Sequence, residues 1–384
     1  MLRFIAGRLV QMFLLFVVFL TLLFFLLQAQ PGDISQQFLA NPAIPPEARR
    51  LLAERLGLDE PLLVQYANYM RNFFTGNMGR SFSQYPREVS SILMERLPRT
   101  IVLFFSATVL AYYLGFTLGK IVAWRRGGLK EYPVTIGGVL LYTVFYPWFA
   151  LLMIWFFAFI LGWFPVGKFL DPPEWREATV AANAVFNRMI FSTVIASLAL
   201  FAAWLLSRRA DDPQTGRRIL GVGGLVILGA FLAYWLTSPI RPYATDIAHH
   251  VILPVITLAL VVFAGVMLLT RSSMLETLRE DYILTARAKG LPERVIRDHH
   301  AARNALLPVT TSLVIALALV ISGGIITETI FSWPGMGEAL LTAVTREDIP
   351  LAIGALSIVG VLALVGHLVV DIVYVYLDPR IRYK

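Results

Sequence analysis

Long apolar runs are the feature of this chain that most limits what it can fold into. Each run is about as long as a helix needs to be to cross a bilayer. The clearest are residues 9–29, 100–123, 134–164, 189–207, 219–237, 249–270, 305–326 and 350–377. A closed β-barrel, the other structure that spans membranes, needs short alternating strands, whereas these runs are continuous. The sequence therefore predicts an all-α polytopic membrane protein with eight spans.

Composition agrees with this prediction and excludes some chemistry. Hydrophobic residues make up 57% of the chain and charged residues 15%, which is outside the range of soluble domains. There is no cysteine, so disulfides and thiolate chemistry are excluded. Four of the five histidines form the adjacent pairs His249–His250 and His299–His300. Neighbours on a helix point in different directions, so we predict no metal site.

The distribution of charge predicts a topology. If the runs are threaded alternately from an inside N-terminus, the inner segments are 1–8, 120–131, 207–218, 271–303 and 378–384. They carry 20 Lys and Arg against 9 Asp and Glu, whereas the outer segments carry 13 against 15. This is the positive-inside pattern, so we expect both termini in the cytoplasm. The net charge of +8 thus reflects topology and does not indicate nucleic-acid binding.

The segments between the runs predict the domain organisation. Residues 1–30 are expected to form an uncleaved anchor helix, 31–98 an extracytoplasmic helical loop, 99–377 the transmembrane domain and 378–384 a cytoplasmic tail. In the extracytoplasmic loop, prolines and glycines bound two short amphipathic helices, Ala48–Leu56 and Leu62–Phe74. We expect their apolar side chains to rest against the membrane domain. The alternative is a docking surface for an external partner, or a lid.

Residues 172–248 are predicted to be an inserted helical hairpin. Two apolar runs flank the segment Ser207–Arg218, which has four arginines and is therefore expected to be cytoplasmic. Such a pair crosses the membrane twice and leaves the orientation of the following helices unchanged. The small residues of Gly221–Gly224 favour close packing on a neighbouring helix. We interpret the hairpin as an accessory without a transport role of its own.

No motif in the sequence predicts an active site. Gly162–Lys168 has the glycine spacing of a phosphate loop, but Phe169 follows it and has no hydroxyl for magnesium. No strand precedes that segment, and the topology places it outside the cell. The chain is therefore predicted not to be an enzyme.

The cytoplasmic loop 271–303 has a different character. Between Thr285 and Gly290 the side chains are small, apart from Arg287 and Lys289, so another protein can approach closely. Pro292 is expected to open a second short helix. Asn304 is expected to cap the returning helix, with Pro308 in its first turn. These features favour a loop that a partner grips at the membrane surface, and the alternative is an ordinary charged loop.

The stretch Asp281-Tyr-Ile-Leu-Thr-Ala-Arg-Ala-Lys-Gly-Leu291 resembles the coupling motif of ABC-transporter permeases of the dipeptide/oligopeptide/nickel importer family, specifically the first permease subunit. Further stretches are similar to that family in the same order. They are Gln30–Asp33, Arg55–Pro61, Gly76–Ser81, Glu95–Thr100, Phe331–Gly337 and Asp371–Arg380. The resemblance covers nearly all of the chain except about residues 172–248. That hairpin is also the departure from the family, because six core helices are implied and eight spans are predicted.

This resemblance implies the type I importer fold and a set of partners. They are a second homologous permease subunit, two ATP-binding subunits, an extracytoplasmic solute-binding protein and membrane lipid, in the inner membrane of a bacterium or archaeon. ATP and Mg would be bound by the ATPase subunits, so no cofactor is expected on this chain. Peptides are the expected cargo, and oligosaccharides or nickel remain alternatives. A secondary transporter is a distant alternative, because no internal repeat or paired intramembrane charge is evident.

The resemblance also assigns site residues. The ATPase-coupling loop is expected to comprise Asp281, Tyr282, Thr285, Ala286, Arg287, Ala288, Lys289, Gly290 and Leu291, with the coupling helix near Thr285–Leu291. Candidates for the gate or translocation path are Glu328, Trp333, Pro334, Gly335, Tyr146 and Asp371. Glu328 is expected either to line the gate or to snorkel to water. Asp371, an intramembrane carboxylate, is a functional candidate unless it is hydrated or paired with an arginine.

Overall fold

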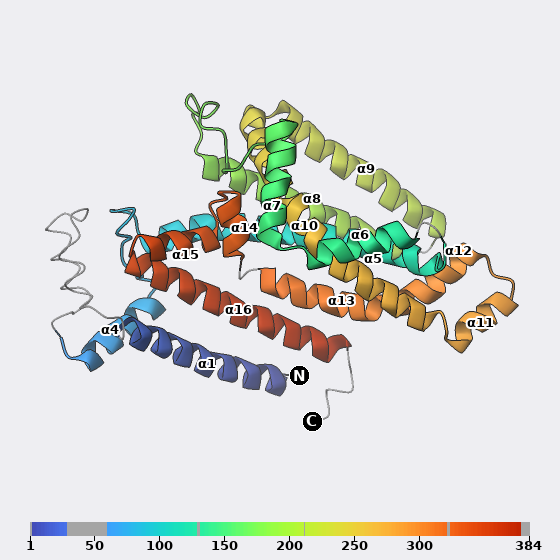
Figure 1. Ribbon diagram of the computed structural model, residues 1–384, viewed down its shortest axis with the longest axis horizontal. Helices are drawn as coiled ribbons and strands as arrows, with labels where there is room; N and C mark the ends of the chain where they lie inside the picture. The colour runs from blue at the N-terminus through green and yellow to red at the C-terminus, as the bar shows by residue number, and fades with distance from the viewer. Residues whose placement is uncertain (1, 29–59, 129–130, 211, 321–322, 378–384) are drawn as a thin grey trace. The chain divides into compact units, whose positions relative to one another are not determined.

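The computed structural model describes residues 2–28, 60–128, 131–210, 212–320 and 323–377. The chain divides into two compact units (Figure 1). Unit 1 comprises Met1–Phe156 and Pro254–Lys384, and unit 2 comprises Phe157–Leu253. The predicted motif Gln30–Asp33, the predicted helix Ala48–Leu56 and the tail 378–384 lie outside the described residues.

The helices follow the apolar runs of the sequence. In chain order they are α1 (Leu2–Gln28), α4 (Leu62–Phe74), α5 (Val89–Trp124), α6 (Glu131–Thr143), α7 (Tyr146–Met153), the π-helix η1 (Ile154–Ile160), α8 (Ala182–Arg209), α9 (Pro213–Thr237), α10 (Arg241–Thr277), α11 (Asp281–Ala288), α12 (Glu293–Val295), the π-helix η2 (Ile296–Ala301), α13 (Ala302–Leu319), α14 (Ile325–Ile330), α15 (Met336–Thr345) and α16 (Ile349–Leu377). No strand occurs among the described residues, which contain one isolated β-bridge. In the part of the chain that the structure describes, seven helices are long and apolar enough to cross a membrane, or eight if the bent α6–α7 pair is one span. The predicted all-α polytopic fold is confirmed.

The third apolar run is broken in the middle. Helix α6 ends at Thr143 and α7 begins at Tyr146, and the two segments meet at a bend of 111°. Pro147 stands in the first turn of α7, where no backbone donor is needed. A bend of this size is of the kind found in a broken span or a re-entrant loop.

Helices α5 and α10 approach closely within unit 1. Four small residues of α5 recur every fourth position and are buried: Ala107, Ala111, Gly115 and Gly119. A Cβ added at Gly115 would lie 2.7 Å from Cβ of Val266, and one at Gly119 would lie 2.7 Å from the carbonyl oxygen of Met267. Real side chains do not approach that closely, so these positions require glycine for the present packing. Small residues at this spacing let two membrane helices come into backbone contact.

The predicted helix Leu62–Phe74 is present with those bounds as α4, and it packs on α1. Aromatic rings dominate the contact, with the centroids of Phe16 and Phe73 5.3 Å apart. The hydroxyl groups of Thr21 and Tyr66 lie 2.8 Å apart and hydrogen-bond. The apolar face of α4 therefore rests on a spanning helix, as expected from the sequence.

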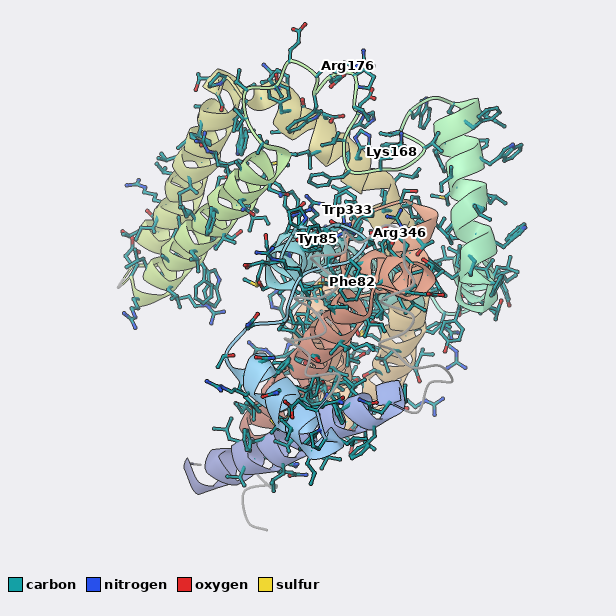
Figure 2. All side chains as sticks on the ribbon, turned by 90° about the vertical axis from the view of Figure 1, so that its left-hand side faces the viewer. Phe82, Tyr85, Lys168, Arg176, Trp333 and Arg346 are labelled. Carbon is teal, nitrogen blue, oxygen red and sulfur yellow. The ribbon has the colours of Figure 1, made fainter. Side chains whose placement is uncertain are left out.

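Unit 2 is dominated by the α8–α9 hairpin, and the predicted insertion lies inside it. Figure 2 shows Lys168 and Arg176 on the loop that precedes α8. The closest approach of the two helices is at Gly216, where an added Cβ would lie 2.6 Å from the carbonyl oxygen of Ser207. At the predicted contact Gly221–Gly224 the fit is ordinary. An added Cβ at Gly223 or Gly224 would lie 3.8 or 3.9 Å from α8, and one at Gly221 would meet nothing within 4 Å.

Candidate functional site

Two polar regions lie at opposite ends of unit 1 (Figure 1). One is built on α11, α12 and η2, which connect α10 to α13, and we call it the α11 end. The other is built on the start of α5 and on α14 and α15. We call it the Glu328 cluster, and its members are Arg96, Arg99, Thr100, Glu328, Glu338 and the turn Trp333–Met336.

Helix α11 is fixed to the bundle by its apolar side. Ile283 and Ala286, three residues apart and thus on one face, are buried in a cluster with Met274, Ala302 and Ala305. Leu291, just beyond the helix, packs on the same cluster. The anchor therefore holds α11 against the end of α10 and the start of α13.

The end of α11 is a Schellman motif centred on Gly290. The amide of Gly290 donates to the carbonyl of Arg287 (2.9 Å), and the amide of Leu291 donates to the carbonyl of Ala286 (3.3 Å). Gly290 has a φ of +71°, a conformation that costs other residues about 1–2 kcal/mol. A Cβ at this position would meet nothing within 4 Å, so the requirement for glycine comes from the backbone and not from space inside this chain.

The opposite side of α11 is exposed. It presents Asp281, Tyr282, Leu284, Thr285, Arg287, Ala288, Lys289 and Gly290. Leu284 is 57% exposed and was not among the predicted site residues. A leucine within an otherwise polar segment was the sequence feature that could have indicated it. Ala286 and Leu291 were predicted to belong to the partner-facing loop, but their side chains turn towards the core. The helix also begins four residues earlier than expected, at Asp281.

The return from α11 differs from the prediction. The short helix after Pro292 exists, but α12 continues through η2 into α13 without a break. Asn304 is therefore inside a helix and caps nothing; its amide Nδ2 donates to the hydroxyl of Tyr282 at 2.7 Å. Pro308 likewise lies in the helix interior and not in a first turn. The prediction failed because a π-helical turn carries the helix past the position where capping residues suggested its start.

Ion pairs tie the α11 end to other helices. The carboxylate of Asp298 in η2 lies 2.9 Å from Nζ of Lys120 in α5 and 2.7 Å from a guanidinium nitrogen of Arg297. Glu131 at the start of α6 lies 2.6 Å from Arg271 of α10. The pairs Lys120–Asp298 and Glu131–Arg271 join segments far apart in sequence, and no local motif predicts them. They hold α5, α6 and α10 in place relative to the α11 end.

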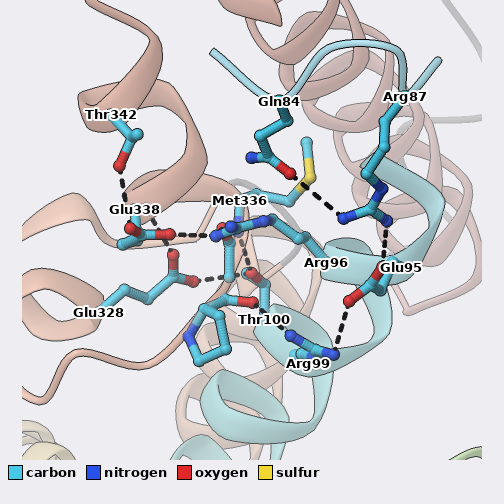
Figure 3. A network of polar contacts seen from close by, with 12 residues as sticks. Gln84, Arg87, Glu95, Arg96, Arg99, Thr100, Glu328, Met336, Glu338 and Thr342 are labelled. Carbon is cyan, nitrogen blue, oxygen red and sulfur yellow. Dashed lines mark hydrogen bonds and ion pairs between the residues drawn. The ribbon is translucent and has the colours of Figure 1, made fainter. Parts of the chain in front are cut away.

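At the other end of unit 1, Glu328 of α14 is fully buried (Figure 3). Its Oε1 accepts from Oγ1 of Thr100 at 2.7 Å, and its Oε2 accepts from the amide of Glu338 at 3.0 Å. Burial raises the pKa of this carboxyl above its usual range. The expectation that Glu328 snorkels to water is wrong, because a separate short helix after α13 turns its side chain inward.

The turn Trp333–Met336 wraps around that carboxylate. Trp333 is fully buried and its Nε1 donates to the carbonyl of Arg99 at 3.2 Å (Figure 2). A Cβ at Gly335 would lie 2.3 Å from the carboxyl carbon of Glu328, so any side chain there would require the carboxylate to move away from its hydrogen-bond partners. Thr100 bridges the two parts, because its Oγ1 donates to Glu328 and accepts from the amide of Met336 at 2.8 Å.

Arginines of α5 complete the cluster. Arg96 pairs with Glu338, and Arg99 reaches the carbonyl of Pro334 at 3.5 Å and Glu95 at 2.9 Å. Nearby, the buried Asp348 accepts hydrogen bonds from the amide and hydroxyl of Ser83 and from the hydroxyl of Ser81 (not shown in Figure 3). Three segments distant in sequence are thus joined by buried polar contacts.

The remaining candidates do not join either region. Tyr146 is half-buried at the start of α7, a helix that packs on α14. Asp371 of α16 lies 3.3 Å from Nε of Arg8 on α1, which confirms the predicted pairing with an arginine. Among the described residues, no three His, Asp or Glu side chains are grouped as metal ligands. The geometry of unit 1 is suited to holding helices together and to presenting a surface.

Known proteins match the chain over its length. The family "Binding-protein-dependent transport system inner membrane component" matches residues 111–383, and the N-terminal family of the same components matches residues 1–104. The di/tripeptide transport system permease protein of Pseudomonas aeruginosa is 33% identical over 386 aligned residues, covering 100% of both chains. The dipeptide transport system permease protein of Escherichia coli is 31% identical, again with 100% of both covered. The oligopeptide transport system permease protein of Bacillus subtilis is 30% identical, covering 94% of this chain and 93% of its own. The chain therefore belongs to the family of inner-membrane components of binding-protein-dependent transport systems.

Proposed function

We propose that the chain is a permease subunit of an ATP-driven importer of peptides and forms half of its translocation path. Membership of the transport family and the names of the relatives, which are di/tripeptide, dipeptide and oligopeptide permeases, support this proposal. Oligosaccharides and nickel remain alternative cargoes, because selection in such a system resides largely in the solute-binding protein.

The observation that carries the proposal is the two-sided surface of α11. Its apolar side is packed into the bundle, while Tyr282, Leu284, Thr285 and Arg287 project away from it. In the proposal this exposed side seats in a cleft of an ATP-binding subunit. Small residues at Ala288 and Gly290 let the partner approach closely, and Arg287 and Lys289 supply positive charge for acidic groups.

The contacts of the α11 end supply a route for movement. A displacement of α11 is passed to α10 and α13 through the buried anchor, and to α5 through Lys120 and Asp298. Because Gly115 and Gly119 bring α5 into backbone contact with α10, these two helices move as one body. Shifting the populations of the closed and open states of such a gate from 1:99 to 99:1 requires a difference of about 5.5 kcal/mol in binding free energy. A loose contact cannot transmit a difference of that size.

The Glu328 cluster is proposed to clamp the opposite mouth of the path. It joins α5, which the α11 end moves, to α14 and α15 through Thr100 and Arg96. Tyr146, on the helix packed against α14, is proposed to lie beside this mouth. Asp371 is assigned a structural pairing with Arg8 instead of a place in the path.

Topology and partners complete the proposal. The chain is placed in the cell membrane of a bacterium or archaeon, with both termini and α11 in the cytoplasm and the Glu328 cluster outside. A second permease subunit, two ATP-binding subunits that hold ATP and Mg, and an extracytoplasmic solute-binding protein assemble around it. The positive-inside charge pattern and the family support this arrangement.

The test is mass spectrometry of the complex purified from native membranes in mild detergent. The proposal expects a second permease, ATP-binding subunits and a solute-binding protein, and the ligand retained by the binding protein identifies the cargo. Recovery of the chain alone, or as a homodimer without an ATPase, would overturn the proposal and favour a secondary transporter.

A further inference from the structure

The tip of the α8–α9 hairpin gathers four arginines on two adjoining helix ends. They are Arg208 and Arg209 at the end of α8 and Arg217 and Arg218 in the second turn of α9. All four side chains are exposed. The contact of Gly216 with the carbonyl of Ser207 holds the two helix ends together here. The four arginines are therefore gathered at one end of the hairpin, which we call the arginine tip.

The charge of the arginine tip is not neutralised by the described part of the chain. No ion pair joins any of the four arginines to a carboxylate among the described residues. The carboxylate of Asp212 is directed instead to the helix it caps, where it accepts from the amide and hydroxyl of Thr215 at 3.0 and 3.2 Å. Segment 207–218 as a whole carries a formal excess of two positive charges. The guanidinium groups thus remain available to an anion.

The lengths of the two helices place the arginine tip at a particular depth. Helix α8 has 28 residues and α9 has 25, and each contains an 18-residue stretch with a mean hydropathy of 2.2. At about 1.5 Å per residue they extend for about 42 and 38 Å, whereas the hydrocarbon core is about 30 Å thick. The helix ends therefore reach the layer of lipid headgroups. Trp204 lies one turn before Arg208, whose guanidinium stacks 4.2 Å from the ring centroid, and tryptophan is typical of that layer.

We propose that the arginine tip binds the headgroups of anionic phospholipids. The planar guanidinium group matches phosphate in a bidentate manner, and basic clusters beside spanning helices attract anionic lipid. The sides of α8 and α9 are almost entirely unburied in the structure, so acyl chains of the same lipids have apolar surface to lie on. A soluble phosphate compound or a nucleic acid would gain nothing from that surface. The inserted hairpin then serves as a binding site for anionic phospholipids.

Native mass spectrometry of the purified complex, titrated with phosphatidylglycerol or phosphatidylcholine, tests this proposal. The variants are the pair Arg208→Gln with Arg209→Gln, the pair Arg217→Gln with Arg218→Gln, and all four together. Arg188→Gln with Arg241→Gln is the matched control, because these exposed arginines lie at the other ends of helices of the same unit. We expect retention of phosphatidylglycerol to fall roughly tenfold for each tip pair, with phosphatidylcholine and the control pair unchanged.

Equal retention of phosphatidylglycerol by the wild type and the fourfold variant would overturn the proposal, as would the same loss in the control pair. Loss of charge can also change topology, so a fourfold Arg→Lys variant is measured as well. It keeps the charge and should retain phosphatidylglycerol better than the glutamine variant. If the lysine variant loses the lipid while the glutamine variant keeps it, the assignment to an anionic headgroup is wrong. Protection of the tip from an arginine-modifying reagent by protein subunits, in complexes stripped of lipid, would assign it to a protein partner instead.

Discussion

The α11 end and the Glu328 cluster are polar regions at opposite ends of unit 1, yet their polar groups are arranged in opposite ways. In the Glu328 cluster a fully buried carboxylate finds its partners inside the chain, on Thr100 and the first turn of α15. On α11 the apolar residues Ile283 and Ala286 are buried, and the polar ones face outward. The first region is completed by folding, whereas the second is left open to a partner.

This difference predicts which property each region controls. A buried polar network loses stability when a member is removed, because the remaining donors and acceptors lose their partners away from water. A surface helix with a firm anchor can change its exposed residues without unfolding. Variants of the Glu328 cluster should therefore change the free energy of unfolding, and variants of exposed α11 residues should change transport at constant stability.

The largest effect is expected for Gly335→Val. A Cβ at this position would lie 2.3 Å from the carboxyl carbon of Glu328, so the turn must open or the carboxylate must leave its partners. We expect a loss of about 3 kcal/mol in the free energy of unfolding, measured by denaturation in detergent. Gly137→Ala is the control, because a Cβ there meets nothing within 4 Å. Equal stability of the two variants would show that the turn is not packed on Glu328.

Removal of the buried carboxylate should have the next largest effect. Glu328→Ala leaves the hydroxyl of Thr100 and the amide of Glu338 without their acceptor, and we expect a loss of about 2 kcal/mol. Glu328→Gln keeps one acceptor oxygen and should cost about half as much. A glutamine variant less stable than the alanine variant would contradict the hydrogen-bonding pattern.

The same carboxyl predicts a dependence of stability on pH. Burial raises its pKa in the folded state, so the folded protein binds the proton more tightly than the unfolded chain does. Its contribution is full below the usual range of a glutamate pKa and is lost as the pH rises through the raised value. Unfolding measured across this range should show that decline in the wild type, and Glu328→Gln should abolish it. A decline of the same size in the glutamine variant would exclude Glu328 as its source.

Gly290→Asp should abolish most transport while leaving stability nearly unchanged. The substitution places bulk and negative charge on the partner-facing side, and stability should change little because aspartate, like asparagine, is one of the few residues that adopt a positive φ and a Cβ here meets nothing within 4 Å. We expect uptake to fall about tenfold or more while ATP hydrolysis by the complex persists. Gly290→Asn is the control, because asparagine has the same size, tolerates a positive φ and adds no charge. Normal substrate-stimulated transport by Gly290→Asp would contradict the proposal that α11 couples ATP hydrolysis to transport.

The smallest effect is expected where the α11 end meets α5. Lys120 and Asp298 are both partly exposed, so breaking their pair should cost only about 0.5–1 kcal/mol of stability. A double-mutant cycle with Lys120→Gln and Asp298→Asn measures the coupling between the two side chains, and the same cycle is read in uptake. Additive effects on uptake would show that this pair does not transmit movement to α5.

Hydropathy predicted the spanning helices because a membrane leaves few alternatives to a long apolar helix. Local signals also predicted α4, which Pro61 precedes and Gly76 follows. Local signals failed at Asn304, which was predicted to cap a helix, because a π-helical turn has no sequence signature. They also failed at Glu328, because its neighbours in sequence suggested the membrane surface and not a buried position. Its partner Thr100 is 228 residues away, and no local pattern records such a contact.

Helix α5 touches both polar regions, with Thr100 near one end and Lys120 near the other. Lys120 follows Thr100 by 20 positions, which correspond to about 30 Å along the helix, and each residue turns the helix by about 100°. One inserted residue would leave the chemistry of every side chain intact and yet point Lys120 away from Asp298. The number of residues between Thr100 and Lys120 is therefore as much a functional quantity as their identity. Replacements in this stretch can be tolerated where changes of length cannot.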